Sequence, residues 1–172
     1  MTKRINNKLF NNFTNLINNS RNMNNYYNYY ESLISFLDKN KKFIRKELFE
    51  LYNLDFLINL DFISYINKNS SLDLTVEKEY MKRKPESTEL LIASISYSLY
   101  EMIRLSVSQE CTICECELFY SFCEFDNSEK KIVLECPICT NIIDINGNLI
   151  KDKVTFSRPA NKYDLEKAGI KL

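Results

Sequence analysis

Two Cys-x-x-Cys pairs constrain the fold of this 172-residue chain more than any other feature of its sequence. The first is Cys111-Thr-Ile-Cys114 and the second is Cys136-Pro-Ile-Cys139, with 21 residues between them. A tight turn of this kind aims two sulfurs at one point, and two such turns supply four thiolates in a tetrahedron, the arrangement that zinc favours. The sequence therefore predicts one structural zinc ion, Zn2+, held by Cys111, Cys114, Cys136 and Cys139.

With these two pairs, the stretch from about Cys111 to Thr155 resembles the zinc-ribbon group, in which two cysteine knuckles lie on β-hairpins. The resemblance covers about a quarter of the chain and implies a zinc ion held by four cysteines. It implies no particular function, because ribbons are found in many unrelated proteins. The segment between the knuckles lacks the basic, aromatic hairpin of ribbons that bind nucleic acid.

Other interpretations of the six cysteines remain open. A thioredoxin-like redox centre expects a single pair in a βαβ unit, and disulfides need an oxidising compartment. We expect Cys123 to be a small buried side chain, because it alternates with Phe119 and Ser121 on one face of a strand. Cys116 lies two residues after Cys114 and is an alternative to it as a ligand.

Composition excludes several classes of function. The chain has no histidine, which removes histidine bases and histidine metal ligands, and its two glycines are too few for a phosphate loop or a dinucleotide fingerprint. No apolar run approaches the ~20 residues of a membrane helix. No signal peptide is visible, so we expect a cytoplasmic protein. A four-thiolate zinc leaves no position for a catalytic water, so we expect no enzyme activity.

The first hundred residues predict helices, because apolar side chains recur at helical spacing. These periodic segments are Ile5–Ile17, Tyr26–Leu37, Phe43–Tyr52 and Leu54–Ile66. The alternation over Leu72–Val76 indicates a short strand or an extended link. Pro85 is expected to begin a long helix that ends near Ser108.

After Ser108 the pattern changes to strands and turns. The expected strands are Leu118–Cys123, Lys131–Leu134, Ile142–Ile145 and Leu149–Thr155. Turns are expected at 126–128 and at Asn146-Gly147, and a last short helix at Tyr163–Ala168, capped by Gly169. The predicted fold class is α+β: a helical N-terminal body over 1–108, a four-cysteine zinc-ribbon β unit over 109–157, and a short helix or tail over 158–172.

Charge is distributed unevenly along this neutral chain. Residues 106–147 hold eight acidic and two basic side chains, together with all six cysteines. Such a segment attracts a basic protein and repels a phosphate backbone, although an ordinary solvated surface is the alternative. The candidate partner-binding acids are Glu115, Glu117, Glu124 and Glu129.

A tyrosine run supplies a second candidate contact. Tyr26 and Tyr30 share a helix face and are expected in the core, so Tyr27 or Tyr29 is expected to be more exposed. Exposed tyrosines often anchor protein interfaces. The basic run over 39–46 is either a solvated helix end or a phosphate contact.

We therefore expect a small cytoplasmic, zinc-containing protein that acts by protein–protein contact. A more specific form of this hypothesis is an immunity protein that neutralises a basic toxin, such as one that cleaves nucleic acid, since acids can mimic phosphate. The alternative is a zinc-ribbon transcription or nucleic-acid accessory factor of a virus or mobile element. In that case the basic run and the tail over 151–171 would carry the contact.

Overall fold

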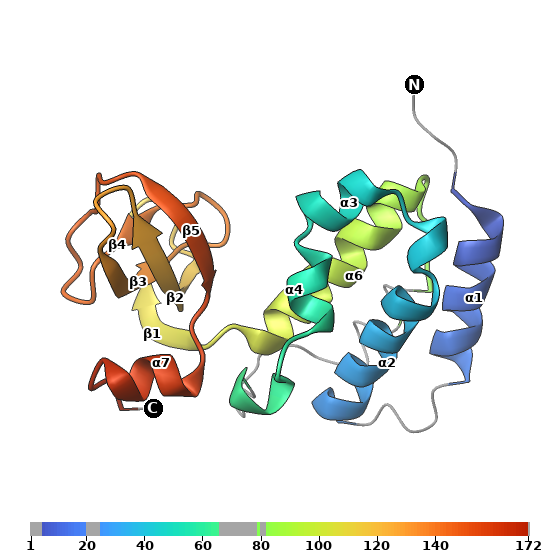
Figure 1. The fold of residues 1–172 in the computed structure, drawn as a ribbon, viewed down its shortest axis with the longest axis horizontal. Coiled ribbons are helices and arrows are strands. Elements are labelled where there is room, and N and C mark those ends of the chain that lie inside the picture. Colours follow the sequence, from blue (N-terminus) through green and yellow to red (C-terminus); the bar gives the residue numbers. More distant parts are fainter. Residues whose placement is uncertain (1–4, 20–24, 66–78, 80–81, 172) are drawn as a thin grey trace. The chain divides into compact units, whose positions relative to one another are not determined.

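The computed structural model describes residues 5–19, 25–65, 79 and 82–171, and the chain forms two compact units (Figure 1). The first, here called the helical unit, comprises 1–61 and 71–102; the second, the sheet unit, comprises 62–70 and 103–172. Helices in the first and a five-stranded antiparallel sheet in the second confirm the α+β class. The strand expected at Leu72–Val76 lies outside the described residues.

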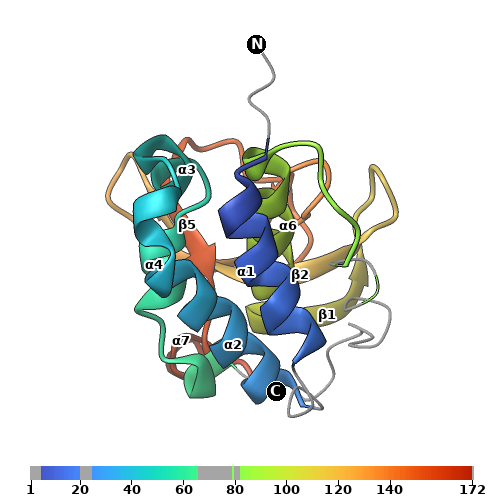
Figure 2. The same cartoon turned by 90° about the vertical axis from the view of Figure 1, so that its right-hand side faces the viewer.

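The helical unit is built around amphipathic helices whose apolar faces meet. Its elements are α1 (Asn7–Asn18), α2 (Tyr26–Lys39), the 3-10 turn η1 (Lys41–Phe43), α3 (Lys46–Leu51), α4 (Leu54–Ile58) and α6 (Thr88–Ile103). Helices α1 and α2 contact each other, as Figure 2 shows, and the rings of Phe13 and Phe36 meet edge to face at 5.1 Å. Leu9, Leu33 and Leu37 are fully buried beside them.

The long helix α6 is shorter at both ends than the sequence predicts. Ser87 Oγ accepts a hydrogen bond from the N–H of Leu90 at 3.1 Å, so the helix begins at Thr88 with a serine cap and not at Pro85. It ends at Ile103 and not near Ser108, because the chain from Ser106 onward pairs with a strand. Of the described helices, none has the length and apolar character needed to cross a membrane.

The sheet unit has one long central strand with neighbours on both sides. Its strands are β1 (Ser106–Glu110), β2 (Glu117–Phe125), β3 (Lys130–Glu135), β4 (Ile142–Ile143) and β5 (Val154–Pro159). The order is β1-β2-β3-β4, and β5 pairs with the second half of β2. A 3-10 turn, η2 (Phe62–Tyr65), and a short helix, α7 (Lys162–Lys167), complete the unit.

The sheet divides its apolar side chains among three small cores. Leu118, Leu134 and Ile143 pack with the cysteine knuckles. Leu105, Ala160 and Leu165 hold α7 against the sheet, while Cys123, Phe125 and Val133 form the third core. The alternation along β2 sends consecutive side chains to opposite faces, so this one strand contributes to the first and third cores.

The turn at 126–128 is confirmed, with Ser128 N–H donating to the Phe125 carbonyl at 2.9 Å. The second expected hairpin forms, but it is shorter than predicted. Gly147 turns the chain with φ +90°, an isolated bridge joins Ile143 to Leu149, and Ile150 N–H donates to the Ile142 carbonyl at 3.0 Å. The strand that follows begins at Val154 and pairs with β2, because the longer strand offers a longer ladder than the two-residue β4.

Helix α7 is confirmed and is tied to β5 by a half-buried ion pair. The two guanidinium nitrogens of Arg158 contact the two carboxylate oxygens of Asp164 at 2.6 and 2.9 Å. Arg158 also donates to Tyr65 Oη at 3.2 Å and stacks 4.6 Å from the Phe122 ring centroid. Gly169 ends the helix with φ +74°, as expected of a left-handed cap.

Candidate metal centre

Each cysteine pair lies on a tight turn, and the first turn joins β1 to β2. Cys111 N–H donates to the Cys116 carbonyl at 2.8 Å, and Glu115 N–H donates to the Cys111 carbonyl at 2.9 Å. Glu115 has φ +59°, a left-handed conformation. This turn bends the chain so that the residues between Cys111 and Cys114 form its tip.

The second turn, between β3 and β4, repeats this backbone pattern position by position. Cys136 N–H donates to the Asn141 carbonyl at 2.9 Å, and Thr140 N–H donates to the Cys136 carbonyl at 3.1 Å. Thr140 has φ +57° and corresponds to Glu115 of the first turn. The two turns are therefore equivalent knuckles, and Asn141 stands where the first knuckle has Cys116.

The two knuckles bring four sulfurs together, and all four Sγ atoms lie within 4.8 Å of one another. Cys111 is 3.4 Å from Cys139, and Cys114 is 3.3 Å from Cys136 and 3.7 Å from Cys139. A tetrahedral ion with bonds of about 2.3 Å places its sulfurs about 3.8 Å apart. The cluster therefore has the donor atoms and the dimensions to hold one metal ion.

Electrostatics within the cluster favour a cation. The N–H groups of Ile113 and Cys114 lower the pKa of Cys111 to about 6, so its thiolate is stabilised. The N–H of Asn141 lowers the pKa of Cys139, but burial and the neighbouring thiols of the cluster raise it to about 12. Thiols this close cannot all ionise alone, because like charges repel at short range. A bound cation removes that obstacle.

The two remaining cysteines lie outside the cluster. The Cys116 thiol contacts the Cys114 carbonyl at 3.5 Å, so Cys116 does not replace Cys114 in the set. Cys123 is fully buried on β2, as predicted, and burial raises the pKa of its thiol. All six cysteines are described, and no disulfide joins any of them.

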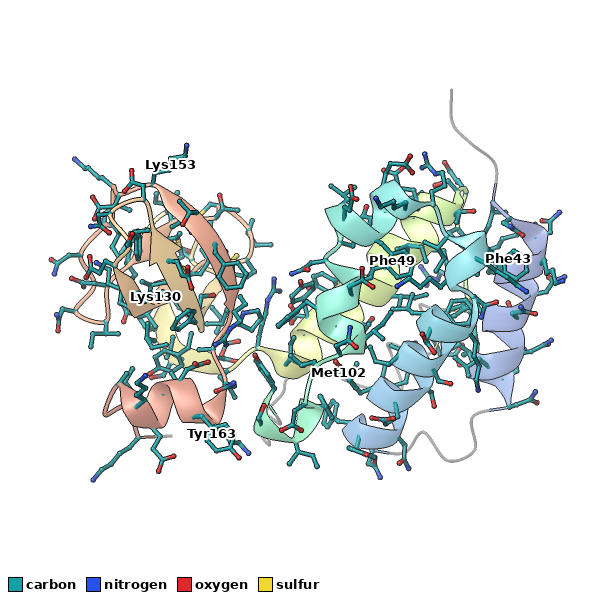
Figure 3. All side chains as sticks on the ribbon, viewed as in Figure 1. Phe43, Phe49, Met102, Lys130, Lys153 and Tyr163 are labelled. Carbon is teal, nitrogen blue, oxygen red and sulfur yellow. The ribbon has the colours of Figure 1, made fainter. Side chains whose placement is uncertain are left out.

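The four candidate acids divide into two pairs at different places in the sheet unit. Glu115 and Glu117 flank the first knuckle, are exposed, and have no ion-pair partner among the described residues. Glu124 and Glu129 lie at the β2–β3 hairpin, where Lys130 (labelled in Figure 3) and Lys131 pair with them at 2.6 and 3.4 Å. Only the first pair leaves its negative charge uncompensated.

The tyrosine run lies at the start of α2 and behaves differently from the prediction at two positions. Tyr27 is 45% exposed, but Tyr29 is fully buried, so the partner contact expected of Tyr29 is wrong. Tyr30 is in the core and donates to the Leu57 carbonyl at 2.8 Å, whereas Tyr26 is only half-buried. Tyr27 is exposed and Tyr29 is buried, a choice that their spacing alone did not decide.

Two exposed isoleucines beside the four-cysteine cluster were not singled out by sequence reasoning. Ile113 and Ile138 each occupy the last position before the second cysteine of their knuckle. The sequence does contain an indication of them, because both CxxC pairs carry an isoleucine immediately before the second cysteine. Comparison of this chain with family models, curated proteins and solved structures finds no match.

Proposed function

We propose that the sheet unit is a protein-binding module, stabilised by one zinc ion in the four-cysteine cluster, and that its partner is basic. Zinc suits four thiolates because it is borderline-soft and accepts tetrahedral geometry without preference of its own. Cys111, Cys114, Cys136 and Cys139 would hold it and leave no open position, so the ion supplies fold stability and not catalysis.

The charge around the metal centre is the observation that carries the proposal. The segments 106–118 and 132–150 contain the knuckles and contribute to the strands around them, and they hold no lysine or arginine. They hold five acids, of which Glu110, Glu115 and Glu117 are exposed. Glu135 and Asp144 are half-buried and accept hydrogen bonds from Ser121 and Asn148 respectively, so the exposed charge is that of the first three. A surface of one sign steers an oppositely charged protein toward it and rejects nucleic acid.

The finer form of the proposal is a cytoplasmic neutralising partner of a basic toxin domain. A domain that cleaves nucleic acid must present lysine and arginine to phosphate, and acids at the metal end are suited to occupy those side chains. Two assays test the toxin-neutralising hypothesis. If the tagged protein, purified from its native host, retains a single basic protein in stoichiometric amount, the hypothesis is supported. If the protein itself binds a polyanion column and is released at moderate salt, the hypothesis is contradicted.

Charge reversal then tests whether the acids make the contact. Changing Glu115 and Glu117 to lysine should slow association with that partner tenfold or more at low salt, because steering is lost. Changing Glu124 and Glu129 to lysine alters the net charge equally at the β2–β3 hairpin and should have a much smaller effect. If both variants slow association equally, the partner responds to the net charge of the chain and not to the acids beside the first knuckle.

A nucleic-acid accessory role is the second candidate, and one observation in the helical unit favours it. The ammonium groups of Lys8 and Lys42 lie 5.1 and 5.3 Å from the ring centroid of Phe43. Phe43 and Phe49 are labelled in Figure 3, and Lys41 lies 4.8 Å from the centroid of Phe49. Basic groups interleaved with accessible rings suit single-stranded nucleic acid, but Phe49 is buried, so only the half-buried Phe43 ring is accessible to a base. Lys41 also pairs with an acid at 2.7 Å, which offsets its charge and makes this candidate the weaker one.

A further inference from the structure

The tips of both cysteine knuckles present an isoleucine to solvent. Ile113 is 67% exposed and Ile138 is 66% exposed. Within each knuckle the two cysteine side chains lie in the sulfur cluster, and of the two residues between them the one before the second cysteine is exposed. The backbone thus creates two equivalent exposed positions, and both are filled by the same large apolar side chain.

This pair differs from the scattered apolar residues of an ordinary surface, which need no explanation. The two knuckles share one cluster, whose four sulfurs all lie within 4.8 Å of one another. The two isoleucines therefore lie on adjoining turns held by the same centre. Neither belongs to any of the three cores of the sheet unit.

Exposed acids border the first knuckle. Glu110, Glu115 and Glu117 are exposed there, and neither knuckle contains a basic residue. The lysines of β3 lie at its start, away from the cysteines, and pair with Glu124 and Glu129. Exposed apolar residues bordered by acids resemble the centre and rim of a protein interface.

We propose that Ile113 and Ile138 are the apolar contact of the protein-binding surface, and that they receive a partner segment with basic side chains around an apolar face. This inference rests on the proposed function and names the part of the sheet unit that carries it. A second copy of the chain is a poor occupant, because acids would then face acids. An anionic membrane or a nucleic acid would be repelled by the same acids.

A pair of synthetic peptides tests the proposal on the full zinc-loaded chain. One is an amphipathic helix of leucine and lysine, and the other has the same composition in scrambled order. Both carry the same charge, but only the first presents an apolar face. The affinities are measured by fluorescence anisotropy, and the contact is mapped by NMR amide shifts of the labelled protein.

The wild-type chain should bind the amphipathic peptide at least tenfold more tightly than the scrambled one, with shifts centred on the knuckle amides, because burying two isoleucines adds to the charge attraction. The double variant Ile113→Ser, Ile138→Ser should lose that difference and keep the weaker, charge-driven binding. Exchanging zinc for cobalt gives a thiolate absorption band that shows whether the variant retains its metal site. The matched control is Ile145→Ser, an exposed isoleucine outside both knuckles.

Three results would overturn the inference. Equal affinity of the two peptides for the wild-type chain would show that no apolar contact exists. Unchanged preference in a double variant that retains its cobalt spectrum would place the contact elsewhere, while a basic protein retained from the native host would still support the proposed function. Binding of neither peptide, with no basic protein retained, would contradict both proposals.

Discussion

Removing the metal should unfold the knuckle half of the sheet unit and leave the helical unit intact. The first core of the sheet unit consists of Leu118, Leu134 and Ile143 with the cysteines themselves, so the ligands are also core residues. When the knuckles separate, these three apolar side chains are exposed to water. At about 1.5–3 kcal/mol for each, roughly 5–9 kcal/mol of burial is lost.

That loss is comparable to the whole stability of a small domain, about 5–15 kcal/mol. The proposed zinc ion would contribute more than this burial, since structural zinc supplies about 10–16 kcal/mol in small zinc peptides. Each 1.4 kcal/mol is a tenfold change in an equilibrium, so a loss of about 5 kcal/mol accelerates amide exchange about a thousandfold or more. The second and third cores do not contain the four cysteines of the cluster, so these two cores can remain folded when the metal is removed.

Hydrogen exchange before and after chelation measures the effect locally. The N–H groups of Cys111, Glu115, Cys136 and Thr140 make the knuckle hydrogen bonds and should lose protection together. Amides in α1, α2 and α6 should keep their protection from exchange, and adding zinc back should restore the protection of the knuckle amides. If elemental analysis shows that the metal has been removed while knuckle protection is unchanged, the metal has no structural role. Cys136→Ser should reproduce the chelated state, whereas Cys116→Ser should retain full zinc content.

Cys123→Ala should keep one zinc per chain and cost only about 1 kcal/mol of stability by urea unfolding, because it removes one small buried group; a halved zinc content would refute the ligand set. Thr140→Gly should stabilise the zinc-loaded chain by about 0.5–1 kcal/mol, because relief of left-handed strain exceeds the entropy cost of glycine, and a lower melting temperature would contradict this. Asp164→Asn should destabilise the chain by about 1–3 kcal/mol at neutral pH. Although burial raises it, hydrogen bonds from Arg158 and Asn161 hold the pKa of Asp164 below its usual value. The carboxylate therefore stabilises the fold above the unfolded pKa of about 4 and loses this effect as the pH falls through the folded pKa, so the wild type and the variant should converge in acid.

The four cysteines of the cluster could be predicted from sequence because their pattern is local and chemically specific. Two matched turns fix where the sulfurs point, and few other residue sets at that spacing share this geometry. Helices α1 and α2 could also be predicted from the sequence, because their apolar side chains recur on one helix face and this pattern does not depend on which elements they pack against. These features depend on neighbours within a few residues along the chain.

The features that sequence reasoning placed wrongly depend on distant residues. Leu149 and Ile150 pair with the preceding segment as expected, but the predicted strand does not continue to Thr155, because β5 (Val154–Pro159) pairs with β2 instead. Helix α6 ends earlier than predicted for the same reason, because Ser106 pairs with Phe119 of β2. The choice between Tyr27 and Tyr29 as the exposed tyrosine stayed open, because periodicity gives the angle between side chains and not which of them faces the core; the structure exposes Tyr27 and buries Tyr29.

The metal centre and the acidic surface belong to one electrostatic system. A zinc ion held by four thiolates, as proposed, would carry a net charge of two negative units by simple addition, and the knuckle N–H groups that donate to sulfur would compensate it only partly. No lysine or arginine in 106–118 or 132–150 compensates the remainder, whereas the hairpin acids Glu124 and Glu129 each have a lysine partner. The chain thus pairs the acids of the β2–β3 hairpin with lysines and leaves Glu115 and Glu117 without an ion pair beside the four-cysteine cluster. That contrast within one sheet is the reason to expect the partner at the knuckles.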